Sequence, residues 1–173
     1  MGERVSMFER ARRHSEFTDF VDTASRYLSR TAYLLTGRQD LADDLVQETL
    51  IRTYAAWDRV RPEEAIGYAR RVLVNLTIDR HRRREPVPME WIDRPDERNA
   101  LARSDDQDEV ARMLADLTPR QRRIVVLRYF EDYTEAQTAE CLGITVGTVK
   151  SACSRALAAL REKHAPLRRE QTS

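Results

Sequence analysis

The sequence has little glycine, proline or cysteine: five Gly, six Pro and two Cys among 173 residues. So few turn-forming residues argue against a β-rich fold, and the length suits one ordinary domain or two small helical ones. We therefore expect an all-α protein. Cys141 and Cys153 belong to no CxxC motif and to no Cys/His pair with metal-ligand spacing. Cysteines without such a partner are more typical of buried free thiols than of a redox switch. The sequence therefore predicts no bound metal or other cofactor.

Long apolar runs are absent as well. No run approaches the roughly 20 residues that a membrane-spanning helix needs, and the N-terminal residues lack the apolar core of a signal peptide. The sequence therefore predicts a cytoplasmic protein with no membrane partner.

Neither sign of charge is in excess, because 30 Lys and Arg stand against 29 Asp and Glu, for a net charge of +1. That average alone argues against a nucleic-acid binder. The charges are segregated, however. Residues 68–84 hold six Arg and one acid, residues 150–169 hold six Lys or Arg and one acid, and residues 85–109 hold nine acids and three Arg. Segregated charge builds basic faces while the total stays near zero, so nucleic-acid binding remains open.

The N-terminal half predicts one helical domain over residues 16–84, after a charged, frayed extension over residues 1–15. Apolar residues recur there at three- and four-residue steps, Gly37 suits the end of the first helix, and Asp40 is a candidate cap for the second. The predicted helices cover residues 16–36, 41–57 and 64–84, with a loop over 58–64. The apolar faces expected for the second and third helices are Leu41, Leu45, Ile51, Tyr54 and Ala55, and Ile66, Tyr68, Ala69, Val72, Leu73, Leu76 and Ile78.

Residues 85–109 are predicted to be a flexible acidic linker. The stretch 85–105 has three of the six prolines and no sustained apolar period. Trp91 and Ile92 inside it are either a docking element or an incidental apolar pair. A second small helical domain is expected over residues 110–165, followed by a tail over 166–173. Its first helix is predicted over residues 109–117 and its second after Thr118 and Pro119, an N-cap followed by proline at the first helical position.

Residues 134–160 have the pattern of a helix-turn-helix. Thr134 and Gln137 have the spacing of a capping box, and Gly143 suits the left-handed position that ends a helix. Thr145 is a natural N-cap for the second helix. The spacing of these residues predicts two short helices that cross at a glycine turn.

The second helix of this motif separates inward-facing from outward-facing residues. The N-terminal end of such a helix is the part that meets the major groove of DNA. The residues expected to face inward are Val149, Ala152, Ala156 and Leu160, and those expected to face outward are Thr148, Lys150, Ser151, Ser154 and Arg155.

Residues 68–84 form a second candidate surface for nucleic acid. Arginine grips phosphate bidentately, and lysine is absent from this stretch. Interleaved aromatic and polar side chains suit unstacked bases, although a solvated face is the alternative. The residues concerned are Arg70, Arg71, Arg80, Arg82, Arg83 and Arg84, interleaved with Tyr68, Asn75 and Thr77.

Asp43, Asp44 and Glu48 are a cluster of acids on the second predicted helix. Di-metal carboxylate bundles add Glu-x-x-His pairs on several helices, whereas the three histidines here are scattered and form no such pair. The chain also shows no nucleophile elbow, phosphate loop or zinc motif. A solvated or partner-binding face is therefore favoured over a catalytic site, and no enzyme is expected.

Several stretches together resemble the sigma factors of bacterial RNA polymerase, in particular the short extracytoplasmic-function group that has only the σ2 and σ4 domains. These stretches are RTAYLLTG, DLADDLVQETLIRTYAAW, YARRVLVNLTIDRHRRR and LTPRQRRIVVLRYFEDYTEAQTAECLGITVGTVKSACSRAL. The resemblance covers about residues 17–84 and 114–163 and is greatest to the actinobacterial SigE-like branch.

The resemblance implies an alternative sigma factor that binds core RNA polymerase and directs promoter-specific initiation. Region 2 would dock on the β′ clamp helices and trap the melted −10 element, and region 4 would contact the β flap and the duplex −35 element. The residues implied for core polymerase are Asp43, Asp44, Gln47, Glu48 and Tyr54; for the −10 element Tyr68, Arg70, Arg71, Asn75, Asp79, Arg80 and Arg83; and for the −35 element Thr148, Lys150, Ser151, Ser154 and Arg155.

Asn75 matches the family position that helps to hold a base flipped from the −10 element, with the loop over residues 58–64 closing over it. The resemblance also implies control by an anti-sigma protein. The sequence departs from the family in having Tyr68 where Trp is frequent, and Ala152 and Cys153 where Arg and a larger aliphatic residue are common. The rival interpretations are a free-standing regulator that binds an operator as a dimer, a structural or adaptor protein, and an enzyme.

Overall fold

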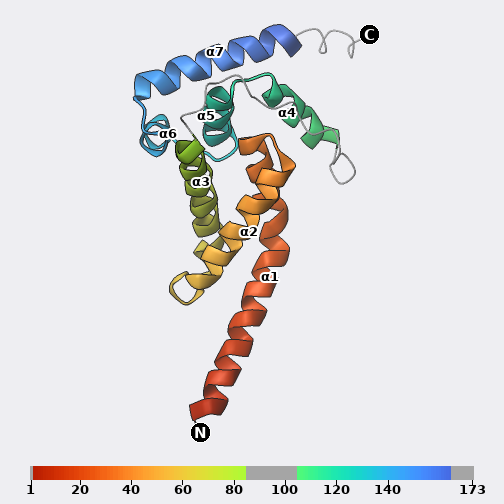
Figure 1. The fold of residues 1–173 in the computed structure, drawn as a ribbon, viewed down its shortest axis with the longest axis vertical. Helices are drawn as coiled ribbons and strands as arrows, with labels where there is room; N and C mark the ends of the chain where they lie inside the picture. The colour runs from red at the N-terminus through yellow and green to blue at the C-terminus, as the bar shows by residue number, and fades with distance from the viewer. Residues whose placement is uncertain (1, 85–104, 165–173) are drawn as a thin grey trace. The chain divides into compact units, whose positions relative to one another are not determined.

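The computed structural model describes residues 2–84 and 105–164, with side chains described for residues 8–80 and 109–164. Within these ranges all regular structure is helical, which confirms the predicted all-α fold (Figure 1). The helices are α1 (Gly2–Thr36), α2 (Gln39–Ala55), α3 (Ala65–Arg84), α4 (Asp105–Ala115), α5 (Pro119–Tyr129), α6 (Glu135–Leu142) and α7 (Val146–His164), with the short 3₁₀ helices η1 (Trp57–Arg59) and η2 (Pro62–Glu64) before α3.

The described residues form two compact units. The first takes them from 1–32 and 40–83, and the second from 33–39 and 84–173. The predicted linker falls outside the described residues as far as residue 104, and so do Trp91 and Ile92. The helix predicted from Glu109 begins earlier, at Asp105.

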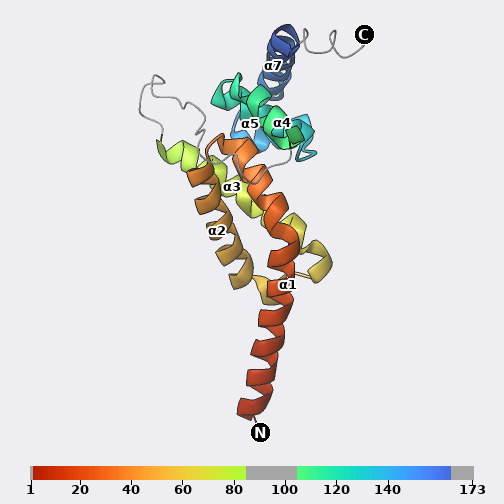
Figure 2. The same cartoon turned by 90° about the vertical axis from the view of Figure 1, so that its right-hand side faces the viewer.

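The first unit contains most of α1 together with α2 and α3. The extension over residues 1–15 was predicted to be frayed, and this prediction was wrong, because α1 begins at Gly2. The N-terminal part of α1 projects past α2 and α3 (Figures 1 and 2). This part of α1 contains few apolar residues, so the sequence shows no apolar face there that would indicate a helix. Instead, an ion pair between Arg12 and Glu16, 3.5 Å apart at i,i+4 spacing, supports the helix, and Arg13 reaches across to the end of α2.

The turn between α1 and α2 is close to the prediction. Gly37 has a φ of +70° and its N–H donates to the carbonyl oxygen of Tyr33 at 2.7 Å, so it ends α1 as expected. The capping role expected of Asp40 was wrong. Because α2 begins at Gln39, Asp40 lies inside the first turn, where its negative charge still suits the helix dipole.

The buried face of α2 differs from the predicted one. Ile51 is 68% exposed, and Tyr54 and Ala55 are exposed as well. The prediction counted only apolar side chains, whereas two threonines are buried here. Thr53 can be buried because its hydroxyl donates to the carbonyl oxygen of Thr49 at 2.8 Å. The buried residues of α2 are Ala42, Leu45, Val46, Thr49 and Thr53.

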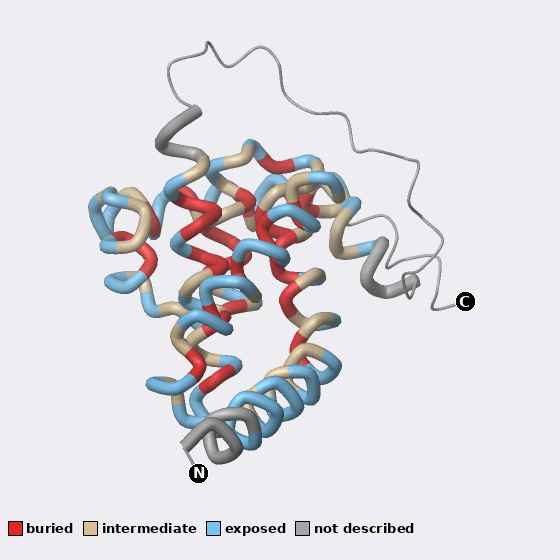
Figure 3. The backbone as a smooth tube through the Cα atoms, turned by 60° about the horizontal axis from the view of Figure 1, so that its bottom comes forward, coloured by how far each residue is buried: buried red, intermediate tan, exposed pale blue. Residues whose placement is uncertain are grey.

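The apolar face predicted for α3 is buried or half-buried apart from Ile66, which is exposed. Along most helices of both units, buried positions alternate with exposed ones, as amphipathic helices require (Figure 3).

In the second unit, α5 begins as predicted. Thr118 is the N-cap and Pro119 occupies the first helical turn. Gln121 completes a capping box, since its N–H donates to the Thr118 hydroxyl at 3.3 Å and its side-chain oxygen accepts from the Thr118 N–H at 3.1 Å.

The predicted helix-turn-helix is present in α6 and α7. Thr134 accepts from the N–H of Gln137 at 3.1 Å, and the Gln137 side chain accepts from the N–H of Thr134 at 2.8 Å. Gly143 ends α6 in the left-handed conformation with a φ of +64°. Both helices pack on α5 around a core of Ile124, Ala139, Val149 and Ala152, flanked by Leu142, Ile144 and Cys153.

Replacing Gly143 by alanine is expected to destabilise the helix-turn-helix by about 1–2 kcal/mol, because a left-handed conformation brings Cβ close to the following carbonyl oxygen. Amide hydrogen exchange over residues 134–160 measures this loss directly. Gly147→Ala is the matched control. That glycine lies inside α7, and an added Cβ would meet nothing closer than the Thr145 hydroxyl at 3.9 Å. Equal losses in both variants would contradict the assigned role of Gly143.

Candidate nucleic-acid and partner interfaces

One face of α2 is polar and open to solvent. Asp43, Asp44, Gln47 and Glu48 are all exposed, and they lie opposite the buried residues of the same helix. Glu48 forms an i,i+4 ion pair with Arg52 at 2.5 Å. Within the described residues no group of three or more His, Cys, Asp or Glu side chains has the arrangement of a metal site.

An ion pair links α2 to α3. The Nη2 atom of Arg80 lies 3.1 Å from a carboxylate oxygen of Asp44. Asp44 belongs to the predicted polymerase face and Arg80 to the predicted −10 surface. Both side chains keep part of their surface in water, so the pair contributes at most about 1 kcal/mol and its members can exchange partners.

The predicted −10 surface of α3 carries one exposed stripe. Arg71, Asn75 and Asp79 recur every four residues and are exposed, so they share a face of the helix. Tyr68, Arg70 and Arg80 are half-buried. Thr77 is buried and its hydroxyl donates to the carbonyl oxygen of Leu73 at 2.8 Å, so it does not contribute to this surface. The side chains of Arg82, Arg83 and Arg84 lie outside those described.

The outward face of α7 is arranged as the sequence predicts. Lys150, Ser151, Ser154 and Arg155 are exposed and Thr148 is half-buried. The four residues expected to face inward, Val149, Ala152, Ala156 and Leu160, are all buried.

The N-terminal end of α7 is fixed by its cap. Thr145 accepts a hydrogen bond from the N–H of Thr148 at 3.2 Å. Lys150 lies 3.6 Å from the carboxylate of Glu135 on α6, and Arg155 donates from Nε to the carbonyl oxygen of Ser151 at 3.2 Å. Both cations thus have a partner within the helix-turn-helix and remain exposed.

The family departures at residues 152 and 153 have a structural consequence. Ala152 is only 5% exposed within the helix-turn-helix core, so it presents no surface to DNA. Cys141 and Cys153 are free thiols, but both are half-buried where the sequence predicted burial, and Cys153 packs against the edge of the core. Partial burial raises the pKa of the Cys153 thiol above its usual range, which keeps it protonated at neutral pH and disfavours redox chemistry.

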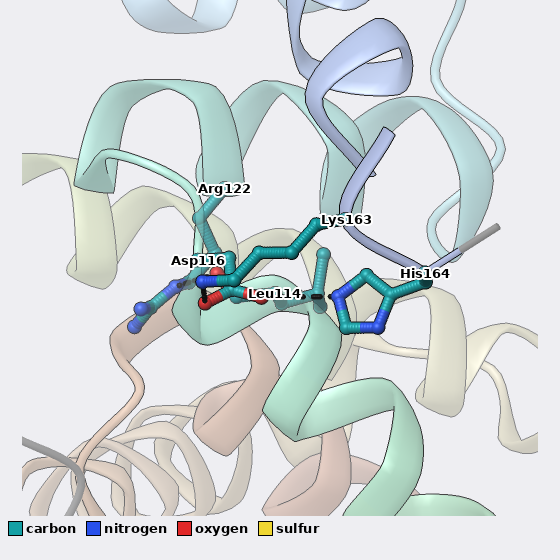
Figure 4. Close-up of polar contacts among 5 residues, drawn as sticks. All are labelled: Leu114, Asp116, Arg122, Lys163 and His164. Atoms are coloured by element: carbon teal, nitrogen blue, oxygen red, sulfur yellow. Dashed lines mark hydrogen bonds and ion pairs between the residues drawn. The ribbon is translucent and has the colours of Figure 1, made fainter. Parts of the chain in front are cut away.

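Asp116 holds the C-terminal end of α7. Its carboxylate accepts hydrogen bonds from Lys163 and, at 3.0 Å, from His164 (Figure 4). Beside it, Nε of Arg122 donates to the carbonyl oxygen of Leu114 at 3.1 Å. The hydrogen bond from Lys163 is the main reason that the pKa of Asp116 lies below its usual value. No sequence pattern indicates this contact, because 47 residues separate Lys163 from Asp116.

Replacing Asp116 by asparagine is expected to lower the free energy of unfolding at pH 7 by about 0.5–1 kcal/mol, as for other partly exposed ion pairs. Folding lowers the pKa of Asp116 below its unfolded value near 3.8. The ion pair therefore contributes to the free energy of unfolding at a pH above the unfolded pKa, and this contribution is lost as pH falls through the folded pKa. Denaturant unfolding of both proteins between pH 7 and pH 2.5 measures the difference, which should shrink towards zero at the acid end. Glu140→Gln, an exposed position on α6, is the control. A difference that does not change with pH would contradict the ion pair.

The structure also brings together residues of different elements that the sequence analysis did not connect. Arg13 and Phe17 from α1 contact Tyr54 at the end of α2, and Phe17 also packs on Trp57 in η1. Ile51 is a large exposed apolar side chain one turn from Gln47 and Glu48. A count of apolar spacing within α2 assigns Ile51 to the core, so only the packed structure identifies it as part of the polar face.

Comparison with known proteins identifies the family. Residues 20–86 match the model of Sigma-70 region 2, and residues 107–160 match that of Sigma-70, region 4. The RNA polymerase sigma-E factor of Streptomyces avermitilis is 38% identical over 151 residues, which cover 86% of this chain and 84% of the relative. This chain belongs to the sigma-70 family. The ECF RNA polymerase sigma factor SigM of Mycobacterium tuberculosis is 31% identical over 163 residues, covering 92% of this chain and 77% of the relative.

The solved structures agree with the fold. In a co-crystal structure from Bartonella quintana, the sigma factor RpoE, in complex with the anti-sigma factor NepR, has a TM-score of 0.54 to this chain at 24% sequence identity. The match covers 84% of this chain and 94% of the other. The predicted membership of the extracytoplasmic-function group and the likeness to the SigE branch are confirmed.

The protein is an alternative sigma factor that directs promoter-specific initiation of transcription. Sigma factors as a class bind core RNA polymerase and promoter DNA and are not themselves enzymes. None of the described helices is both long enough and apolar enough to cross a membrane.

Proposed function

We propose that this sigma factor binds core RNA polymerase through the polar face of α2 and reads promoter DNA through α3 and α7. The observation that carries the proposal is the ion pair between Asp44 and Arg80, because it sets the proposed polymerase face beside the proposed −10 surface within one unit. A sigma factor whose polymerase contact and melted-strand contact are adjacent couples docking to strand capture.

The polymerase contact is assigned to the β′ clamp helices. Gln47 and Glu48 supply hydrogen-bonding and charged groups, and Asp43, Asp44 and Tyr54 border them. The exposed side chain of Ile51 lies among these residues. An apolar side chain inside a polar rim is the usual composition of a protein interface, where the apolar centre is desolvated and the rim gives specificity. Polymerase, not this chain, carries out the phosphodiester chemistry.

Asn75 is assigned to a base flipped from the −10 element. Flipping costs a few kcal/mol in lost stacking and pairing, which hydrogen bonds to the base edge and stacking in a fixed pocket offset. Arg71 and Asp79 share the exposed stripe with Asn75, and half-buried Tyr68 supplies an aromatic surface at the start of it. Arg70, Arg80 and Arg83 contribute positive charge for the strand backbone.

Region 4 is assigned to the duplex −35 element and the β flap. Thr148, Lys150, Ser151, Ser154 and Arg155 lie on the first three turns of α7, the part of a recognition helix that enters the major groove. Few phosphate contacts are available from two cations, so this surface alone binds DNA weakly. Binding of region 4 to the promoter therefore depends on polymerase, which region 2 recruits.

We infer that the protein acts in the cytoplasm, where polymerase transcribes the genome, and that an anti-sigma protein of the kind implied by the family resemblance controls it. Such a protein would cover both the α2 face and the α7 face. Binding there would exclude polymerase and DNA at the same time.

Transcript-start mapping after induced expression of the chain tests the proposal. The account predicts a set of new start sites whose upstream DNA shares two elements, near −35 and −10. Overexpressed Gln47→Ala/Glu48→Ala protein is the control and should give none of these starts. New starts that share a single palindromic site would instead indicate a free-standing regulator that binds an operator as a dimer.

A further inference from the structure

The N-terminal part of α1 contacts the segment that joins α2 to α3. Arg13 makes three contacts there: Nη1 lies 2.8 Å from the carboxylate of Asp58, Nη2 donates to the carbonyl oxygen of Tyr54 at 2.8 Å, and the guanidinium carbon lies 4.7 Å from the centre of the Tyr54 ring. One side chain thus holds the last turn of α2 and the 3₁₀ helix η1 at the same time.

Aromatic packing continues this contact along α1. Phe17, one turn after Arg13, lies 4.8 Å from the Tyr54 ring and 5.0 Å from the Trp57 ring, both in edge-to-face geometry. Phe20 lies 5.1 Å from Trp57, which is buried. These aromatic contacts hold the Trp57 ring in place. They do not involve residues 58–64.

The segment after Trp57 has little packing of its own. Asp58, Arg59 and residues 61–64 are exposed, and only Val60 is half-buried. Two 3₁₀ helices shape the segment, and 3₁₀ turns are held by less favourable hydrogen bonds than α-helices. The ion pair between Arg13 and Asp58, whose side chain is 66% exposed, is a contact between α1 and the start of this segment.

The geometry indicates that Arg13 sets position more than it adds stability. Its Nε is buried and has no hydrogen-bond partner in the described part of the chain. A buried donor without a partner costs free energy that offsets the gain from the two outer nitrogens. Lysine cannot replace arginine here, since a single ammonium does not reach a carboxylate, a carbonyl oxygen and a ring face in fixed geometry.

We propose that Arg13 is a positioning residue that holds residues 58–64 in place for capture of the flipped −10 base. The proposal rests on the proposed function of Asn75 and on the loop over residues 58–64 closing over the base, as the family resemblance implies, and it adds to them a residue of α1 that lies 45 positions before Asp58. Base capture requires a pocket fixed before the base arrives, and displacement of a supporting segment weakens capture without touching the base.

Binding of single-stranded −10 probes to holoenzyme tests the proposal. The probes are labelled non-template strands of a cognate promoter, in which each −10 position is replaced in turn by an abasic site. Wild-type holoenzyme should show one position at which the abasic site weakens binding strongly. Arg13→Ala holoenzyme should bind the intact probe about tenfold more weakly than wild type. With this variant, the abasic site at the sensitive position should reduce binding little further, because both changes remove the same interaction. Arg12→Ala is the matched control and should resemble wild type, because within the described part of the chain the Arg12 side chain pairs with Glu16 on its own helix.

Separate outcomes distinguish the two claims. If wild-type holoenzyme has no sensitive position, base capture itself is wrong and the role of Arg13 falls with it. If the position exists but Arg13→Ala binds every probe as wild type does, or weakens intact and abasic probes equally, then the positioning role is wrong while base capture stands.

Two further readouts separate positioning from folding and from docking. Thermal melting of the free protein should remain close to wild type in Arg13→Ala. Because Arg13 also contacts Tyr54 at the edge of the proposed polymerase face, a small loss of affinity for core polymerase is expected, and a loss of polymerase affinity equal to the loss of probe affinity would overturn the proposal. If Arg13→Ala fails to fold, Asp58→Asn decides the question, since it removes the same ion pair from the other partner and should show the same pattern across the probes.

Discussion

Replacement of both Gln47 and Glu48 by alanine is expected to weaken association with core polymerase about a hundredfold, since loss of two central interface side chains typically costs a few kcal/mol. Both side chains are exposed, and the buried residues of α2 remain untouched. Alanine also favours the helix, so the variant should fold. Fluorescence titration of labelled protein with core polymerase measures the change.

The control for this variant removes exposed charges from another helix. Glu9→Ala with Asp22→Ala changes two exposed side chains of α1 that have no assigned contact with polymerase. We expect its affinity to stay within about twofold of wild type, because isolated surface substitutions have small effects. If the two double variants bind alike, the polar face of α2 is not the docking surface.

Replacement of Asn75 by alanine is expected to leave association with polymerase intact and to reduce promoter opening by about tenfold to a hundredfold. The reason is that a flipped base left without its edge hydrogen bonds forfeits about 1–3 kcal/mol. Asn75 is exposed while its neighbours Val74 and Leu76 are buried, so the helix should hold without the amide. Permanganate reactivity of −10 thymines in the holoenzyme complex measures opening directly.

Ile66→Ala is the matched control for Asn75→Ala. Ile66 is exposed on α3 and has no assigned contact with DNA. It should open promoters as wild type does. Should Asn75→Ala lose polymerase association to the same degree as the Gln47/Glu48 variant, the division between a docking helix and a strand-capturing helix is wrong.

Features that depend on local rules could be predicted from the sequence. The capping box of Thr134 with Gln137 and the left-handed turn at Gly143 depend on side chains a few residues apart, and both are present. The outward face of α7 follows from helical spacing in the same way. The exposed face of α7 was thus predictable, whereas the roles of individual residues at polymerase and DNA come from family resemblance and remain predictions.

Features that depend on distant contacts could not be predicted. Arg13 meets Tyr54 across 41 residues and Arg80 meets Asp44 across 36, and no periodicity in the sequence reports either contact. The helical N-terminal part of α1 was missed because the ion pair of Arg12 with Glu16 and the contacts of Arg13 with Tyr54 and Asp58 support it in place of an apolar stripe. The core face of α2 was misassigned because the prediction counted only apolar side chains, whereas Thr49 and Thr53 are buried there and the Thr53 hydroxyl donates to the carbonyl oxygen of Thr49.

Run-off transcription from a mapped cognate promoter, with purified core polymerase and this chain, is the most direct test of the two-surface account. We expect a discrete transcript only when both proteins are present. Gln47→Ala/Glu48→Ala should strongly reduce the amount of this transcript, and Lys150→Ala/Arg155→Ala should reduce it comparably on a template that retains its −35 element. Tight sequence-specific binding of the promoter by this chain without polymerase, together with no transcript when core polymerase is added, would contradict the account.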